Sequence, residues 1–191
     1  HQEVKRLRTL PSAAPQGAAT SPEPQTKMLV PARTAGAIIG KQGSKLKEIR
    51  EGTGAHLEVL PKDRAPQWVD DRVVIVKGAL QSRQAALQQV LQAAYPPDQP
   101  QEAVELKLLI SSTAAGGVIG KAGANLKVIR ETCNVGVKVE REEMLGERLV
   151  SATGGMNSIV QASAMVLELI EGPRSSGGMP AAASPYQVGL Y

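Results

Sequence analysis

The chain has 191 residues, of which 42% are hydrophobic and 21% charged, and its formal net charge is +4. This composition is that of a folded globular protein and excludes disorder over the whole length. The chain has one Trp, three Tyr and no Phe, which argues against a protein that stacks bases on aromatic side chains. The single Cys excludes an internal disulfide and a multi-cysteine zinc site. No apolar run is long enough for a membrane span.

Both ends of the chain are poor in large apolar residues. Residues 1–26 carry a short basic patch and are otherwise rich in Ala, Pro, Ser, Gln and Thr. Because they cannot bury enough apolar surface to offset the entropy of ordering, we expect a disordered tail. Residues 172–191 have the same character, and the prolines after Tyr95 predict a linker at residues 96–102.

Residues 27–95 have the pattern of one small α+β unit. The elements predicted within it are, in chain order, a strand at 27–33, a short helical turn from Ala35 that stops at Gly40, a helix at 44–53, strands at 56–60 and 72–77, and an amphipathic helix that buries Leu87, Val90, Leu91 and Ala94.

The same pattern returns in residues 103–171. With a shift of 80 residues, segment 36–60 lies over segment 116–140, and 11 of the 25 positions are identical. Further along the shift falls to 76, because a loop between two apolar runs differs in length. The second set of predicted elements is a strand at 104–111, a helical turn from Thr113 that stops at Gly120, a helix at 124–133, strands at 135–140 and 148–153, and a helix that buries Ile159, Ala162, Val166, Leu169 and Ile170. The chain is therefore predicted to be two βααββα units joined by a linker.

The two units differ in charge. Residues 27–95 contain 11 Lys and Arg against 6 Asp and Glu, whereas residues 103–171 contain 7 against 8. If the protein binds a polyanion, long-range attraction comes mainly from the first unit. A second site that is weak alone still contributes, because tethering raises its effective concentration.

Each unit has a Gly-Lys-x-Gly segment between its first two helical stretches, at residues 40–43 and 120–123. Two glycines this close permit a sharp turn, and they leave the main chain open to another backbone. The following helix presents unpaired N–H groups at its start, and the lysine adds a positive charge. These features suit a sugar–phosphate backbone, whereas the spacing fits neither a P-loop nor a dinucleotide-binding loop.

The segments IIGKQGSKLKEIRE and VIGKAGANLKVIRE resemble the signature of the type I K-homology (KH) domain, which binds single-stranded RNA or DNA. Among KH proteins the pair is most similar to the poly(C)-binding, hnRNP K and Nova group. The resemblance implies an α+β fold of two type I KH domains, each with a three-stranded antiparallel sheet and three helices on one face. It also implies a groove in which the glycine loop holds about four nucleotides.

Transferred by position, the resemblance implies a binding site in each unit. The left wall of the grooves would begin at Ala35 and Ala115. The residues expected to bind RNA in the first unit are Gly36, Ala37, Ile39, Gly40, Lys41, Gln42, Gly43, Lys47, Arg50, Leu57, Glu58, Val59 and Arg72. Those in the second unit are Gly116, Gly117, Ile119, Gly120, Lys121, Ala122, Gly123, Lys127, Arg130, Val137, Lys138, Val139 and Arg148.

Small and β-branched walls favour a pyrimidine over a purine, and an arginine can donate to O2 and N3 of cytosine, so we predict a preference for C or U. Glu58 either accepts from cytosine N4 or repels phosphate. The alternative interpretations, in which these residues do not bind RNA, are that Arg50 and Arg130 pair with nearby carboxylates and that the glycine turns are purely structural.

The other chemically reactive residues form no catalytic constellation. We expect Cys133 to be a small buried residue, and His56 has no second metal ligand nearby. Trp68 lies in a loop and either packs locally or contacts nucleic acid. The glutamates at 140, 142, 143 and 147 resemble a charged loop rather than a metal site. We therefore expect no enzyme activity, no cofactor and no metal.

The sequence predicts a nuclear or cytoplasmic protein that binds single-stranded RNA in the post-transcriptional regulation of mRNA. One alternative is a KH protein that binds single-stranded DNA, since KH grooves make few obligatory contacts to the 2′-hydroxyl. Another is an interaction scaffold, in which KH units pair with each other or the tails recruit protein partners. Salt dependence separates phosphate binding from an apolar interface.

Overall fold

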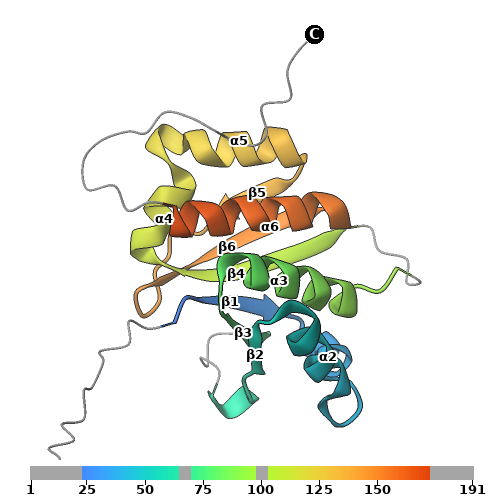
Figure 1. Ribbon diagram of the computed structural model, residues 1–191. Helices are drawn as coiled ribbons and strands as arrows, with labels where there is room; N and C mark the ends of the chain where they lie inside the picture. Colours follow the sequence, from blue (N-terminus) through green and yellow to red (C-terminus); the bar gives the residue numbers. More distant parts are fainter. Residues whose placement is uncertain (1–22, 65–69, 98–102, 173–191) are drawn as a thin grey trace, which may run out of the picture.

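The computed structural model describes residues 23–64, 70–97 and 103–172 (Figure 1). Most of the two predicted tails and of the predicted linker lies outside the described residues, as does Trp68. Within the described segments, no helix is long and apolar enough to cross a membrane.

The first unit has the predicted βααββα order. Its elements are β1 (Gln25–Val30), α1 (Ala35–Ile39), α2 (Ser44–Thr53), β2 (His56–Val59), β3 (Arg72–Lys77) and α3 (Leu80–Ala94). Short 3₁₀ turns cover Ala32–Thr34, Lys41–Gly43 and Lys62–Arg64. The strand predicted at 27–33 instead begins at Gln25, inside the predicted tail, and ends at Val30. Pro31 follows, and it has no N–H to donate to a neighbouring strand.

The second unit repeats this order. Its elements are β4 (Val104–Ser111), α4 (Ser112–Ile119), α5 (Ala124–Cys133), β5 (Gly136–Val139), β6 (Glu147–Gly154) and α6 (Met156–Glu171), with a 3₁₀ turn at Lys121–Gly123. In α4 the hydroxyl of Ser111 accepts from the N–H of Ala114 at 3.1 Å, and this cap lets the helix start earlier than its counterpart α1.

All six strands belong to one antiparallel sheet with the order β2-β3-β1-β4-β6-β5. Each unit supplies three neighbouring strands, as the α+β prediction requires. The two three-stranded sheets are not separate, however, because β1 pairs with β4 and joins them edge to edge. Helices α3 and α6 lie side by side over this junction (Figure 1).

The main core lies between the sheet and the helices and extends through both units. Met28 and Leu108, on the two junction strands, are both fully buried in it. The stripe predicted for α3 is buried throughout. In α6 the prediction was partly wrong: Leu167 is buried, whereas Leu169 and Ile170 are half-buried.

A second apolar cluster lies on the other face of the sheet. Side chains alternate along a strand, so Leu29, between the core residues Met28 and Val30, points away from the helices. It packs with Val73 and Leu109, and all three are buried. This cluster joins β3 and β1 of the first unit to β4 of the second.

Candidate nucleic-acid interface

The two Gly-Lys-x-Gly turns have almost the same backbone. Gly40, Gln42 and Gly43 have φ values of 73°, 51° and 81°, and the matching residues of the second unit have 73°, 53° and 79°. Three positive φ values within four residues make a sharp corner between α1 and α2, and again between α4 and α5. The predicted turn is therefore present twice with one geometry.

The first glycine of each turn is required by close packing. A Cβ on Gly40 would lie 2.7 Å from both N and Cβ of Lys45, and one on Gly120 would lie 2.7 Å from Cγ of Asn125. The second glycine, Gly43 or Gly123, faces open space and needs only its left-handed φ.

The tip of each turn offers hydrogen-bond donors to solvent. Gly40 and Gly43 donate to Gly36 O and Gly40 O at 2.8 and 3.4 Å, but the N–H groups of Lys41 and Gln42 make no backbone hydrogen bond among the described residues. Both side chains are exposed, and Lys41 has no ion pair within the described part of the chain. Lys121 and Ala122 stand in the same positions of the second turn.

Helix α1 ends in two isoleucines, of which one side chain lies in the core and the next lies toward the predicted groove. Ile38 is fully buried, whereas Ile39 is half-buried, and Val118 and Ile119 repeat this in α4. A Cβ on Gly36 would meet no atom within 4 Å, and the same is true of its counterpart in the second unit. Apart from the exposed methyl group of Ala37 in the first unit, this wall is therefore bare main chain with one aliphatic side chain at its end.

Strand β2 contributes alternate residues to the two faces of the sheet. Leu57 is fully buried and Val59 is half-buried against the same core, so Glu58 between them points to the helix-free face. In β5, Val137 and Val139 pack against the core as Leu57 and Val59 do, and Lys138 between them pairs with Glu140 at 2.7 Å on the other face. Glu58 and Lys138 therefore present their main chain, not their side chains, to the helix side where the groove was predicted.

Arg50 and Arg130 cross from their helices to the neighbouring strand. The Arg50 guanidinium donates through Nε, at 3.0 Å, and through Nη2 to the carbonyl oxygen of Leu57. Arg130 donates in the same way to Val137 O, at 3.1 and 2.7 Å. Neither arginine forms an ion pair among the described residues, so the reading in which each pairs with a carboxylate is wrong. Their guanidinium groups are instead held beside β2 and β5.

Arg72 and Arg148 occupy equivalent strand positions but different environments. Arg72 donates through Nε and Nη2 to Leu60 O at 3.0 and 2.8 Å. The Nε of Arg148 is buried and has no hydrogen-bond partner in the described part of the chain. Arg72 therefore fixes the end of β2, whereas Arg148 does not repeat this bond.

The remaining predicted lysines lie further out on the helix surface. Lys47 and Lys127 are about three-quarters exposed and pair with the glutamates four residues later, at 3.7 and 3.8 Å. Such exposed pairs contribute little to stability. These two lysines can therefore leave their partners for a phosphate at low cost.

The sequence analysis did not single out Asn125, which replaces Lys45 of the first unit. Its Nδ2 donates to Gly117 O at 2.7 Å and so closes the α4–α5 corner. An Asn two residues after a glycine turn is the only signal that could have indicated this role, because short amides often bond to nearby main chain.

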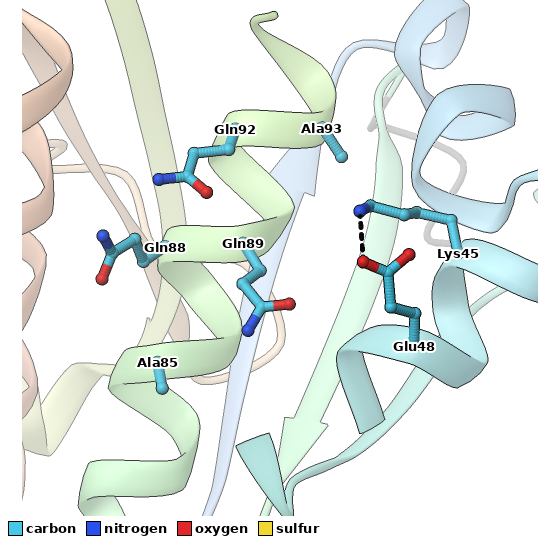
Figure 2. Close-up of a pocket in the computed structure, with 7 residues that line it drawn as sticks. All are labelled: Lys45, Glu48, Ala85, Gln88, Gln89, Gln92 and Ala93. Carbon is cyan, nitrogen blue, oxygen red and sulfur yellow. Dashed lines mark hydrogen bonds and ion pairs between the residues drawn. The ribbon is translucent and has the colours of Figure 1, made fainter. Parts of the chain in front are cut away.

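The described residues contain no cluster of three or more His, Cys, Asp and Glu side chains able to hold a metal ion. Cys133 is buried, as predicted, and burial raises the pKa of its thiol. A polar cavity of about 530 Å³ lies between α2 and α3 (Figure 2). Figure 2 shows Gln89 on the side of α3 toward the ion pair of Lys45 and Glu48, whereas Gln88 and Gln92 extend from the opposite side of the helix. None of the residues that line this cavity is among those predicted to bind RNA.

Comparison with known proteins places both units in one domain family. The family model described as "KH domain" matches residues 25–92 and again residues 105–168. The RNA-binding protein Nova-2 of Homo sapiens is 28% identical over 172 residues, which cover 78% of this chain and 35% of Nova-2. A KH domain-containing protein of Arabidopsis thaliana is 33% identical over 151 residues, covering 76% of this chain and 24% of that protein.

The chain thus spans about a third and about a quarter of the length of these two relatives. Among solved structures, Dim2p from Pyrococcus horikoshii OT3 is 18% identical, with 78% of this chain and 92% of that chain covered and a TM-score of 0.31. Because the family model accounts for both units and for most of the chain, this protein belongs to the KH domain family.

Proposed function

We propose that this chain binds single-stranded RNA through both of its KH units. The observation that carries the proposal is the pair of Gly-Lys-x-Gly turns with one backbone geometry and exposed lysines, whose tip N–H groups make no backbone hydrogen bond within the described part of the chain. The similarity to Nova-2, an RNA-binding protein by name, supports it.

The turn would hold the sugar–phosphate backbone. Bare main chain at Gly36 and Gly43, where a Cβ would meet no atom within 4 Å, allows a close approach, and the N–H groups of Lys41 and Gln42 can donate to phosphate oxygens. The Lys41 ammonium adds a mobile positive charge at the same point. KH domains use this type of loop to hold the backbone of about four nucleotides.

The bases would lie between the glycine-turn helix and β2. Ile39 and Val59 offer half-buried aliphatic surfaces, and Arg50 uses two of its donors on Leu57 O. A guanidinium has five N–H donors, so others remain for a base edge. Since O2 and N3 of a cytosine accept hydrogen bonds and a small ring suits a narrow slot, we propose a preference for C and U.

The decisive test changes the two turn tips. Lys41→Asp with Gln42→Asp, and Lys121→Asp with Ala122→Asp, put negative charges where the phosphate would lie. Gln42 and Ala122 have left-handed φ values, which Asp tolerates better than most residues, so both units stay folded. We expect binding to a C/U-rich single-stranded RNA to fall at least about 100-fold, measured by fluorescence anisotropy.

The matched control places Asn at the same four positions. Asn adopts left-handed φ at least as readily as Asp but carries no charge, so it separates charge repulsion from any change in the turn. The Asn variant loses the two lysine charges but gains no negative ones, so we expect it to lose clearly less affinity than the Asp variant. Wild-type affinity in the Asp variant, with an unchanged circular dichroism spectrum, would contradict the proposal.

Two further measurements separate the alternatives. Competition between RNA and DNA oligonucleotides of one sequence, and between C/U-only and purine-only RNA, measures the preference for sugar and base. A steep fall of affinity with salt concentration is expected for phosphate binding, whereas a protein-interaction scaffold held by apolar contacts would show little.

A further inference from the structure

The junction between the two units is symmetric. Met28 of β1 is paired with Leu108 of β4, which is its own counterpart in the repeat, and Lys27 pairs with Leu109 while Leu29 pairs with Lys107. Such self-complementary pairing is the mark of a twofold relation. Because β1 and β4 are antiparallel and the helices of both units lie on one face of the sheet, the axis stands perpendicular to the sheet between Met28 and Leu108.

This symmetry extends to the outer strands. In register with Met28 lie Val74 of β3 and then Val59 of β2. In register with Leu108 lie Val150 of β6 and then Val139 of β5. Val59 and Val139, which border the two predicted grooves, thus stand at the same level on opposite edges of the sheet.

Side-chain contacts hold the two units in this arrangement. On the helix-free face, Lys27 pairs with Glu147 at 2.5 Å and Lys107 pairs with Asp71 at 3.0 Å. Bonding to Asp71 and the charges of Asp71 and Glu105 raise the pKa of Lys107 despite the opposing effect of burial.

On the helix face, Arg83 of α3 is 1% exposed and forms an ion pair with Glu171 of α6. Gln84 of α3 also donates to Ala164 O at 3.3 Å. Each of these contacts joins the first unit to the second, so the orientation of the two grooves is built into the folded state.

The direction of bound strands follows from the axis. A twofold rotation about an axis perpendicular to the sheet reverses every direction within the sheet plane. Two RNA segments that lie the same way in their own grooves, along β2 and β5, therefore run antiparallel to each other. Five strand spacings separate β2 from β5, or about 24 Å.

On the basis of the proposed function, we infer that the protein selects RNA in which two single-stranded segments are joined by a looped spacer. A continuous tract cannot run straight from one groove to the other, because it must cross the sheet and reverse its direction. The spacer has to span at least about 24 Å. Contiguous binding motifs occupy one unit at a time.

The test is a series of synthetic RNAs, each with two C/U tetranucleotides. The 3′ end of the first tetranucleotide is joined to the 5′ end of the second, as in a natural RNA chain. The two segments are joined directly, by a polyethylene glycol spacer shorter than about 24 Å, or by spacers longer than this distance. We expect the direct and short probes to bind no more tightly than a single tetranucleotide. Affinity should rise at least about tenfold once the spacer exceeds the span and then fall slowly with length.

A variant of the junction between the two units tests whether this junction sets the spacer length at which affinity rises. Lys27→Glu with Lys107→Glu replaces both ion pairs on the helix-free face with repulsion between like charges. We expect the weakened junction to let the direct probe gain affinity. Lys77→Glu is the control, because Lys77 lies on β3 and forms no ion pair among the described residues. It should keep the wild-type dependence on spacer length.

The outcomes separate the two proposals. If the single tetranucleotide does not bind, the proposed function fails. If the tetranucleotide binds but the direct probe is as tight as the spaced ones, the looped arrangement is wrong. Each variant is first shown to bind the single tetranucleotide as the wild type does, which excludes a folding defect.

Discussion

At the residue scale, the two glycines of each turn have different physical roles. Gly40 has a positive φ and is also packed against the first turn of α2, whereas Gly43 has only the positive φ. Both glycines fit the motif Gly-Lys-x-Gly equally well, so the motif alone cannot tell which substitution would destabilise the fold more. The difference depends on where α2 lies relative to the turn.

This difference gives a ranked prediction for alanine substitutions. Gly43→Ala should lower the free energy of unfolding by about 1–2 kcal/mol, the cost of a left-handed conformation for an L-residue. Gly40→Ala adds a clash at 2.7 Å with N and Cβ of Lys45, so we expect about 2–5 kcal/mol. Urea denaturation measures both.

Gly36→Ala is the control, because it lies in α1, has open space for a Cβ and should raise stability by up to about 1 kcal/mol. Equal losses for Gly40→Ala and Gly43→Ala would contradict the packing argument.

At the element scale, α3 and α6 are equivalent helices with different buried polar residues. Arg83 of α3 stands where α6 has Ile159, and Ser163 of α6 stands where α3 has Leu87. Arg83 donates from Nε to Gly78 O and from Nη1 to Thr26 Oγ1, each at 2.8 Å, and pairs with Glu171 across the junction. Because Arg83 is buried, its charge is partly desolvated, and this lowers the pKa of the guanidinium.

A buried charge that loses its partner is costly, and this predicts a non-additive pair of substitutions. Glu171→Ala alone should lower the free energy of unfolding by about 1–3 kcal/mol, because Arg83 keeps its charge without a counter-ion. Arg83→Ile copies the residue that the second unit has at this position. The double variant should therefore be at least as stable as Glu171→Ala, which a double-mutant cycle by thermal denaturation can measure. Strictly additive losses would show that the two residues do not interact.

At the scale of the whole molecule, one sheet and one core join the two repeats. The main core cluster contains residues of every strand and of every helix longer than a 3₁₀ turn. A repeat with its own complete core can unfold by itself, whereas a shared core and a shared sheet couple the two units.

We therefore expect a single cooperative unfolding transition, with the one cysteine as a reporter of the second unit. Cys133 is 3% exposed and burial raises the pKa of its thiol, so it should react with a thiol reagent only after unfolding. Gly40→Ala, in the first unit, should then shift Cys133 labelling to lower urea concentration by the same amount as it shifts the circular dichroism signal. Cys133 labelling that is unchanged by this substitution would mean that the units unfold independently.

The sequence by itself determined the repeat, the order of elements in each unit and the two glycine turns, because these depend on local periodicity and on backbone angles that few residues adopt. Helices α2 and α5 have the predicted bounds for this reason. Only the tertiary structure decided that β1 pairs with β4, that Arg50 and Arg130 are held on strand carbonyls, and that Glu58 and Lys138 face away from the helices. These features depend on contacts between residues distant in the chain and on which face of the sheet is covered, and no local pattern encodes either of them.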